Sequence, residues 1–259
     1  MSSRADQGEQ QRAEGEQAAA TRDQRVRRLW LFGGSTVVAL VVVAIAIALS
    51  QSGSSDSDGK GLGGGDDLSG VASTAALFKG IPQTGTLVGD PQAPLRMLEF
   101  ADLQCPFCAQ YTREVLPTLV KRYVRTGQLS IDLRLLTFIG SDSQVAAGAA
   151  IAASRENRIW QFSDLFYKNQ GQENSGYVTP DFLRSIASGS GVSPEAAVTG
   201  SQEDVDAPQL VRTNREATTA GINSTPSFLL GKRGGTLTKL EISQLTPDEF
   251  ISAIDKLAN

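Results

Sequence analysis

The sequence predicts an α/β domain with a helical insertion, preceded by a single N-terminal transmembrane helix. Three observations lead to this fold class. Residues 29–49 of the 259-residue chain form an uncharged, mostly apolar segment. Apolar runs typical of buried strands begin near Leu95 and at Leu129, and helical periodicity follows the first of them. About ninety residues, mostly of helical pattern, then separate the second run from a third one, "SFLL", which follows Pro226.

The composition of the chain argues against several classes of function. The chain carries a net charge of −4, which gives no basic surface for nucleic acid, so we expect no nucleic-acid partner. It also contains no histidine. Catalysis by a Ser-His-Asp triad or by a Cys-His pair is therefore excluded.

The N-terminal part predicts a tail and an anchor. Residues 1–28 are rich in Gln, Glu, Arg and Ala, and such a segment buries too little apolar surface to order itself. At about 1.5 Å rise per residue, a helix over 29–49 spans a hydrocarbon core of about 30 Å. Signal-peptide cores are shorter, about 7–15 residues, so an uncleaved anchor is favoured. Small residues around Ala46 and Ala48 leave a cleavage site as the alternative.

Charges that flank the anchor predict its orientation. The arginines before the span are Arg22, Arg25, Arg27 and Arg28. Only Lys60 follows the span within about twenty residues, so the positive-inside rule predicts a cytoplasmic N-terminus. Residues 50–70 are rich in Gly, Ser and Asp, typical of a flexible linker. We therefore expect a single-pass protein of the cell membrane whose domain, residues 71–259, is extracytoplasmic.

Cys105 and Cys108 are the only cysteines, and they form a C-x-x-C motif. A static disulfide across so short a loop adds little stability, because the stabilisation grows with loop length. Structural zinc takes four Cys or His ligands, and completing the set with Glu99 and Asp102 would be unusual. Unreactive core cysteines are the third alternative. We favour a redox-active dithiol and expect no metal.

The residues around the motif support redox chemistry. Pro106 suits the first position of a helix, which places Cys105 at the helix N-terminus. Free backbone N–H groups there stabilise a thiolate, so we expect a lowered pKa for Cys105, mainly through the helix terminus. Phe107 supplies no cation. Cys108 lies one turn further in, where we expect a more buried thiol that resolves mixed disulfides.

Several segments resemble one family. The strand, the loop, the C-x-x-C motif and the helix together resemble the thioredoxin fold. The segment "GTLVGDPQAPLRMLEFADLQCPFC" is similar to the DsbA-like thiol–disulfide oxidoreductases, many of which are anchored in bacterial membranes. "FKGIPQTG", "FYKNQGQENSGYVT" and "GINSTPSFLLG" are similar to the same family, so the resemblance covers residues 78–259. Thioredoxin itself has Trp before the first cysteine, where this chain has Gln104.

The resemblance implies roles for particular residues. Cys105 is then the attacking nucleophile and Cys108 the resolving thiol. Thr225 and Pro226 match a Thr-cis-Pro pair that faces the disulfide and docks the substrate peptide. An ordinary trans proline in a loop is the alternative for Pro226.

The resemblance also implies a proton acceptor and shows one departure. Glu99 matches a buried acid that takes the proton of Cys108, and Asp102 is the substitute candidate. The alternative for Glu99 is a side chain that reaches solvent. The best-known oxidases of the family have His within the C-x-x-C motif, whereas the dipeptide here is Pro106-Phe107. The redox direction therefore stays open.

The remaining pattern completes the predicted thioredoxin-like domain. Gly127 is expected to end the active-site helix, and a strand is expected over 129–136. A helical insertion over about 142–221 lies between this second strand and the strand after Pro226. A hairpin and a last helix, which begins after Thr246 and runs to Ala258, close the domain.

The sequence therefore predicts a membrane-tethered extracytoplasmic thiol–disulfide oxidoreductase that oxidises reduced or unfolded secreted proteins. It needs no cofactor beyond the Cys105–Cys108 disulfide. The resemblance alone implies a membrane partner that reoxidises it, either DsbB-like or similar to vitamin K epoxide reductase. Two alternatives remain: a reductase or isomerase with the same residues, and a tethered peptide-binding or chaperone module with a static disulfide.

Overall fold

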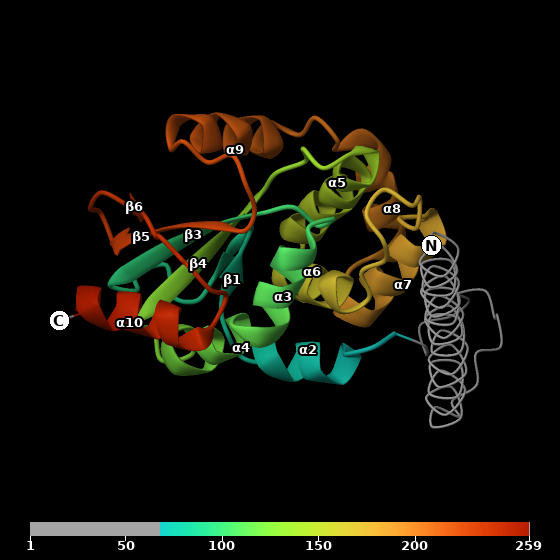
Figure 1. Ribbon diagram of the computed structural model, residues 1–259. Helices are drawn as coiled ribbons and strands as arrows, with labels where there is room; N and C mark the ends of the chain where they lie inside the picture. Colours follow the sequence, from blue (N-terminus) through green and yellow to red (C-terminus); the bar gives the residue numbers. More distant parts are fainter. Residues whose placement is uncertain (1–67, 259) are drawn as a thin grey trace, which may run out of the picture. The chain divides into compact units, whose positions relative to one another are not determined.

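The computed structural model describes residues 68–258 (Figure 1). The predicted tail, the predicted anchor at residues 29–49 and nearly all of the predicted linker lie outside the described residues. Within residues 68–258, no helix combines the length and the apolar character needed to cross a bilayer.

A six-stranded mixed sheet forms the centre of the domain, with the order β1-β2-β4-β3-β5-β6. Its strands are β1 (Gln83–Thr84), β2 (Leu87–Val88), β3 (Leu95–Ala101), β4 (Leu129–Leu135), β5 (Ser227–Lys232) and β6 (Thr238–Lys239). The central strand β3 runs parallel to β4 and antiparallel to β5. Six of the seven residues of β3 are buried, which explains its nearly continuous apolar run. The predicted strand from Leu95 is confirmed.

The two faces of the sheet are covered by different helices. Figure 1 shows α3 (Pro106–Glu114) and α10 (Pro247–Ala258) on one side and α9 (Pro208–Thr219) on the other. Leu98 and Phe100 of β3 pack in one cluster with Ala217 of α9. Because side chains alternate along a strand, Glu99 between them points to the opposite face, toward α3 and α10.

The helical segment that follows the cysteines ends at Gly127, as the sequence predicts, but it is not one regular helix. After α3 the chain continues as α4 (Leu116–Leu119) and a π-helical turn (Val120–Val124). The break falls at Val115, two residues before Pro117. Proline lacks the N–H of an interior helical residue, and its ring collides with the preceding turn, so α3 cannot run through it.

Five helices separate β4 from β5: α5 (Ser141–Arg155), α6 (Ile159–Lys168), α7 (Pro180–Ser190), α8 (Pro194–Glu203) and α9. The Ala-rich helix α5 approaches α8 closely through Gly148 and Gly200. A Cβ atom at Gly148 would overlap the carbonyl oxygen of Gly200. Small residues therefore allow these two helices to pack together.

A helix that the sequence pattern did not indicate, α2 (Val71–Phe78), precedes the sheet and packs on α6. The Thr74 hydroxyl donates to the carboxylate of Asp164, which also accepts from Lys168 Nζ at 2.7 Å. This buried network joins α2 to the insertion.

Candidate active site

The two cysteines lie at the start of α3, where the chain leaves β3. Cys105 is the N-cap of α3 and Pro106 is its first residue, as the sequence predicts. The backbone N–H of Ala109 donates to the carbonyl oxygen of Cys105 at 3.1 Å and closes the first turn. Both thiols are free. Cys108 is fully buried and Cys105 is 4% exposed, so Cys108 is the more buried of the two, as expected, although Cys105 is itself largely covered.

The two thiols have opposite pKa shifts. The pKa of Cys105 is lowered to about 6, first because it accepts a hydrogen bond from the Cys108 thiol. The Thr225 side chain and the backbone N–H groups of Cys108 and Phe107 lower this pKa further, and burial opposes them. Burial raises the pKa of Cys108 well above its ordinary value, and the hydrogen bond and charge of Cys105 add to the rise. The predicted direction for the Cys105 pKa is confirmed, but the helix terminus is not its main cause.

A cis peptide bond between Thr225 and Pro226 faces the first cysteine. The Cys105 thiol donates to the carbonyl oxygen of Thr225 at 3.3 Å. A cleft of about 300 Å³ adjoins this bond, lined by Phe107 of α3, residues 224–228 and residues 239–245. Phe107 is 61% exposed at its edge. An extended chain bound in this cleft would lie next to Cys105.

Glu99 lies in the middle of β3 and is 1% exposed, which excludes the alternative of a side chain in solvent. Burial raises the pKa of Glu99 to about 8, and the Tyr111 hydroxyl opposes this rise. Oε2 of Glu99 has no hydrogen-bond partner among residues 68–258. Glu99 is thus a buried acid whose pKa lies close to physiological pH, as an exchanger of protons requires.

Asp102, the substitute candidate, is also buried, and burial raises its pKa. Its carboxylate accepts from the backbone N–H groups of Gln104, at 2.9 Å, and Ile139, at 3.3 Å. These bonds fix the turn into α3 and the loop after β4. Because Asp102 already holds the backbone in this way, Glu99 is the better candidate for proton exchange.

Sequence reasoning missed a set of polar residues that fasten the insertion to the active-site loop. Gln170 Nε2 donates to the carbonyl oxygens of Leu103, at 2.7 Å, and Cys105, at 3.2 Å. Gln104 Nε2 donates to the Tyr177 hydroxyl at 2.9 Å. Gln170 and Tyr177 belong to "FYKNQGQENSGYVT", a segment that is similar to the DsbA-like family. That similarity was the one sequence signal that could have predicted their role.

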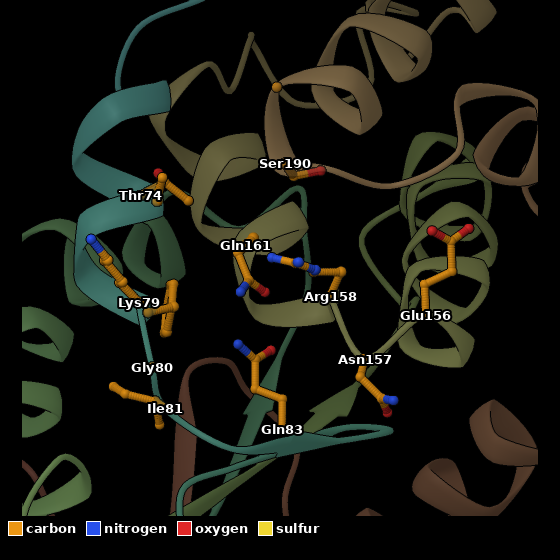
Figure 2. Close-up of a pocket in the computed structure, with 13 residues that line it drawn as sticks. Thr74, Lys79, Gly80, Ile81, Gln83, Glu156, Asn157, Arg158, Gln161 and Ser190 are labelled. Atoms are coloured by element: carbon orange, nitrogen blue, oxygen red, sulfur yellow. The ribbon is translucent and has the colours of Figure 1, made fainter.

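A second, larger cleft of about 610 Å³ lies elsewhere, between α2, α6 and α7 (Figure 2). Gln83, Arg158 and Gln161 are among the polar residues that line it, and no cysteine does. The described part of the chain also contains no group of three or more Cys, Asp or Glu residues arranged to hold a metal ion. The reactive groups are therefore gathered at the start of α3.

The comparisons with known proteins agree with this geometry. The family model described as thioredoxin matches residues 82–256, more than half of the chain. The chain belongs to the thioredoxin family. This thioredoxin-family member is 36% identical over 101 residues to the probable disulfide bond formation protein D of Bacillus cereus. That match covers 38% of this chain and 47% of the Bacillus cereus protein. The chain therefore spans about half the length of this relative.

Two further comparisons cover more of the domain. The disulfide bond formation protein D of Bacillus subtilis is 25% identical over 173 residues, covering 66% of this chain and 74% of the relative. The crystal structure of oxidised BdbD from Bacillus subtilis matches with a TM-score of 0.59 at 22% identity, covering 69% of this chain and 97% of that chain. This structural match shows a shared fold. The predicted resemblance to DsbA-like thiol–disulfide oxidoreductases is confirmed.

Proposed function

We propose that this protein is a membrane-tethered, extracytoplasmic thiol–disulfide oxidoreductase that introduces disulfides into secreted proteins. One observation carries the proposal: two thiols of opposite pKa shift lie at the start of α3, facing a cis peptide bond. A lowered pKa for Cys105 favours the thiolate and so stabilises the reduced pair. A dithiol whose reduced form is stabilised tends to oxidise other thiols.

The reaction begins with the Cys105–Cys108 disulfide. A substrate thiolate attacks Sγ of Cys105, which retains some exposure, while Sγ of Cys108 is fully buried. The disulfide breaks and Cys108 leaves with the electron pair. Because the raised pKa of Cys108 disfavours a buried thiolate, it takes a proton, and protonated Glu99 is the proposed donor.

A second substrate thiolate completes the exchange. It attacks the substrate sulfur of the mixed disulfide, and Cys105 leaves as a thiolate. The lowered pKa of Cys105 makes it a good leaving group at neutral pH. The substrate gains one disulfide and the protein becomes the dithiol, so the cycle needs a reoxidant.

The predicted anchor at residues 29–49 supports a location at the membrane. Its uncharged length and the arginines before it are consistent with a cytoplasmic tail and an extracytoplasmic domain. We infer that a membrane redox partner, DsbB-like or similar to vitamin K epoxide reductase, reoxidises the dithiol. The tether would keep both proteins in one membrane and so raise their effective concentration.

A redox equilibrium tests the proposed direction. The full chain in detergent micelles is equilibrated with glutathione buffers of graded ratio, and its reduced and oxidised forms are counted by thiol alkylation and mass. We expect a pair that is more oxidising than glutathione. A pair more reducing than glutathione would indicate a reductase or isomerase. If the pair did not exchange with glutathione at all, the disulfide would be static and the protein would be a peptide-binding module.

Trapping tests the assigned order of attack. Cys108→Ser, mixed with an oxidised substrate, should accumulate mixed disulfides: the Cys105 thiolate attacks the substrate disulfide and expels one substrate thiolate, and the Cys108 thiol that would release the bound substrate is absent. Cys105→Ser should form none and should not oxidise a reduced substrate. Oxidation by the Cys105→Ser protein at the rate of the unchanged protein would contradict the mechanism.

A further inference from the structure

Tyr111 is a buried tyrosine next to the reactive thiols, three residues after Cys108 on α3. It is 0% exposed, and its ring packs against Phe228 of β5 and Phe250 of α10, with ring centroids 4.7 and 5.4 Å away. Residues three apart on a helix share one face, so Tyr111 and Cys108 both point toward the sheet. The tyrosine hydroxyl is therefore held inside the protein near the second thiol.

The sheet register brings Glu99 into the same layer. Glu99 pairs directly with Phe228 across the antiparallel strands β3 and β5. Directly opposed residues of an antiparallel pair point to the same face of a sheet. Phe228 contacts Tyr111, so the carboxylate of Glu99 and the ring of Tyr111 lie in the layer between the sheet and α3.

Both polar groups in this layer lack an ordinary partner. Among the described residues, neither the Tyr111 hydroxyl nor Oε2 of Glu99 has a hydrogen-bond partner of standard geometry. Leaving a buried polar group without a partner costs about 1–3 kcal/mol, so each of these two groups needs an explanation. One group is a donor and the other an acceptor, and each affects the pKa of the other.

We propose that Tyr111 is a positioning residue that controls proton exchange between Glu99 and Cys108. Its hydroxyl keeps its own proton and donates a hydrogen bond to the Glu99 carboxylate when that group is ionised. This bond stabilises the ionised form against the effect of burial. Glu99 can then both give and take a proton near neutral pH, which burial alone would prevent.

The step that depends on this arrangement is the attack by Cys108. In a mixed disulfide on Cys105, the Cys108 thiol gives its proton to the Glu99 carboxylate. Its sulfur then attacks Sγ of Cys105, forms the disulfide and expels the bound thiol as a thiolate with the electron pair. The inference rests on the proposed function, because it assumes that the C-x-x-C pair exchanges.

Other titratable groups around Glu99 are few. Tyr167 of α6 couples electrostatically to Glu99 and to Cys108, and its hydroxyl donates to the carbonyl oxygen of Asp102 at 3.2 Å. Asp102 and Cys105 lie at the end of β3 and the start of α3. The neighbours of Glu99 on β4 and β5, Leu133 and Phe228, carry no charge. Tyr111 is thus the hydroxyl that acts directly on Glu99 within the described residues.

The test uses 5,5′-dithiobis(2-nitrobenzoate) and the reduced full chain in detergent micelles. Attack by Cys105 releases one equivalent of thionitrobenzoate, and resolution by Cys108 releases a second. Both phases are followed by stopped-flow absorbance between about pH 6 and 10. In the unchanged protein we expect the rate of the second phase to rise through a midpoint near the pKa of Glu99, about 8.

Tyr111→Phe keeps the ring contacts and removes only the hydroxyl. We expect the midpoint of the second phase to move up by about one pH unit, and its rate at pH 7 to fall about three- to tenfold. The first phase should change less than about twofold, since Cys105 attacks without Glu99. In a Glu99→Gln background, Tyr111→Phe should have no further effect on the second phase.

The matched control is Tyr123→Phe, which removes a hydroxyl that donates to Asp255 at 2.6 Å, away from the cysteines. It should leave both phases unchanged. An unmoved midpoint in Tyr111→Phe, or an equal effect of Tyr111→Phe in the Glu99→Gln background, would overturn the inference alone. Release of only one equivalent by the unchanged protein would overturn the proposed function as well.

Discussion

The thiol of Cys105 donates to the carbonyl oxygen of Thr225 over 3.3 Å, although 120 residues separate the two in the chain. The Thr225 side chain also hydrogen-bonds to the Cys105 sulfur and lowers its pKa. Thr225→Val keeps the shape and removes the hydroxyl. We expect the pKa of Cys105 to rise from about 6 by about half a pH unit to one pH unit, since a neutral hydrogen bond contributes about 1 kcal/mol.

The rate of alkylation by iodoacetamide against pH measures this change, with a Cys108→Ala background to isolate Cys105. Cys108→Ala also removes the hydrogen bond from the Cys108 thiol, which is the largest cause of the lowered pKa of Cys105. The Thr225 variant is therefore compared with the Cys108→Ala protein and not with the unchanged protein. Ser224→Ala is the control, because Ser224 is an exposed neighbouring hydroxyl. Equal alkylation profiles for the Thr225→Val and Ser224→Ala proteins would contradict the assigned contribution of Thr225.

The stability difference between the reduced and the oxidised protein should depend on pH. The pKa of Cys105 is lowered from 9.0 to about 6 in the folded dithiol, so the thiolate stabilises the folded state fully above pH 9. This contribution falls as the pH drops from 9 and is lost below about 6. We expect the reduced form to gain on the order of 1–3 kcal/mol over the oxidised form between pH 6 and 9, allowing for solvent screening.

Urea unfolding of both redox forms at a series of pH values measures that difference. A difference that stays constant between pH 6 and 9 would show that the thiolate is not stabilised by the fold. The Cys105→Ser protein, which forms no internal disulfide, supplies the control for the reduced form alone, because it has no titrating group at this position.

Glu99→Gln should stabilise the oxidised protein at alkaline pH. The pKa of Glu99 is raised from 4.5 to about 8, so its burial costs nothing extra below pH 4.5, the cost grows as the pH rises from 4.5 to 8, and it is fully present above pH 8. The variant removes the charge and should lose this pH dependence, with a gain of several kcal/mol near pH 9. Unfolding of the oxidised form isolates the effect from the thiols. The exposed Glu173→Gln should change the free energy of unfolding very little at any pH.

Gly148→Ala should destabilise the insertion. The added Cβ would overlap the carbonyl oxygen of Gly200, so α5 and α8 must move apart. We expect a loss of about 1–3 kcal/mol in the free energy of unfolding, as for overpacked cores. Gln144→Ala, at an exposed position of the same helix, should be neutral or slightly stabilising. Equal unfolding curves for the two variants would contradict the close packing.

Local signals were enough to predict the elements that carry the cysteines. The buried run from Leu95 and Pro106 at a first helical position define the strand, the loop and the helix start by short-range rules. The break at Val115 is also local, and Pro117 was its visible signal. The apolar spacing of the segment indicated helix as far as Gly127 but gave no sign of this break.

Other features depend on contacts that no local pattern encodes. The pKa of Cys105 is set first by the Cys108 thiol, whose approach depends on the geometry of the folded helix start. The coupling of Tyr111 to Glu99 arises from strand register and from the packing of Phe228, which links segments more than a hundred residues apart. The sequence pattern places Tyr111 only on the apolar face of a helix and gives no sign that its hydroxyl lies near Glu99.

Gln170 donates to the carbonyl oxygens of both Leu103 and Cys105, and so one side chain of the insertion completes the backbone hydrogen bonding of the reactive loop. The insertion is therefore part of the structural unit that holds the C-x-x-C motif. A shortened version that joined β4 directly to β5 would leave both oxygens without this donor and Gln104 without its contact to Tyr177. Attempts to reduce the protein to a minimal domain should therefore keep the 169–177 segment.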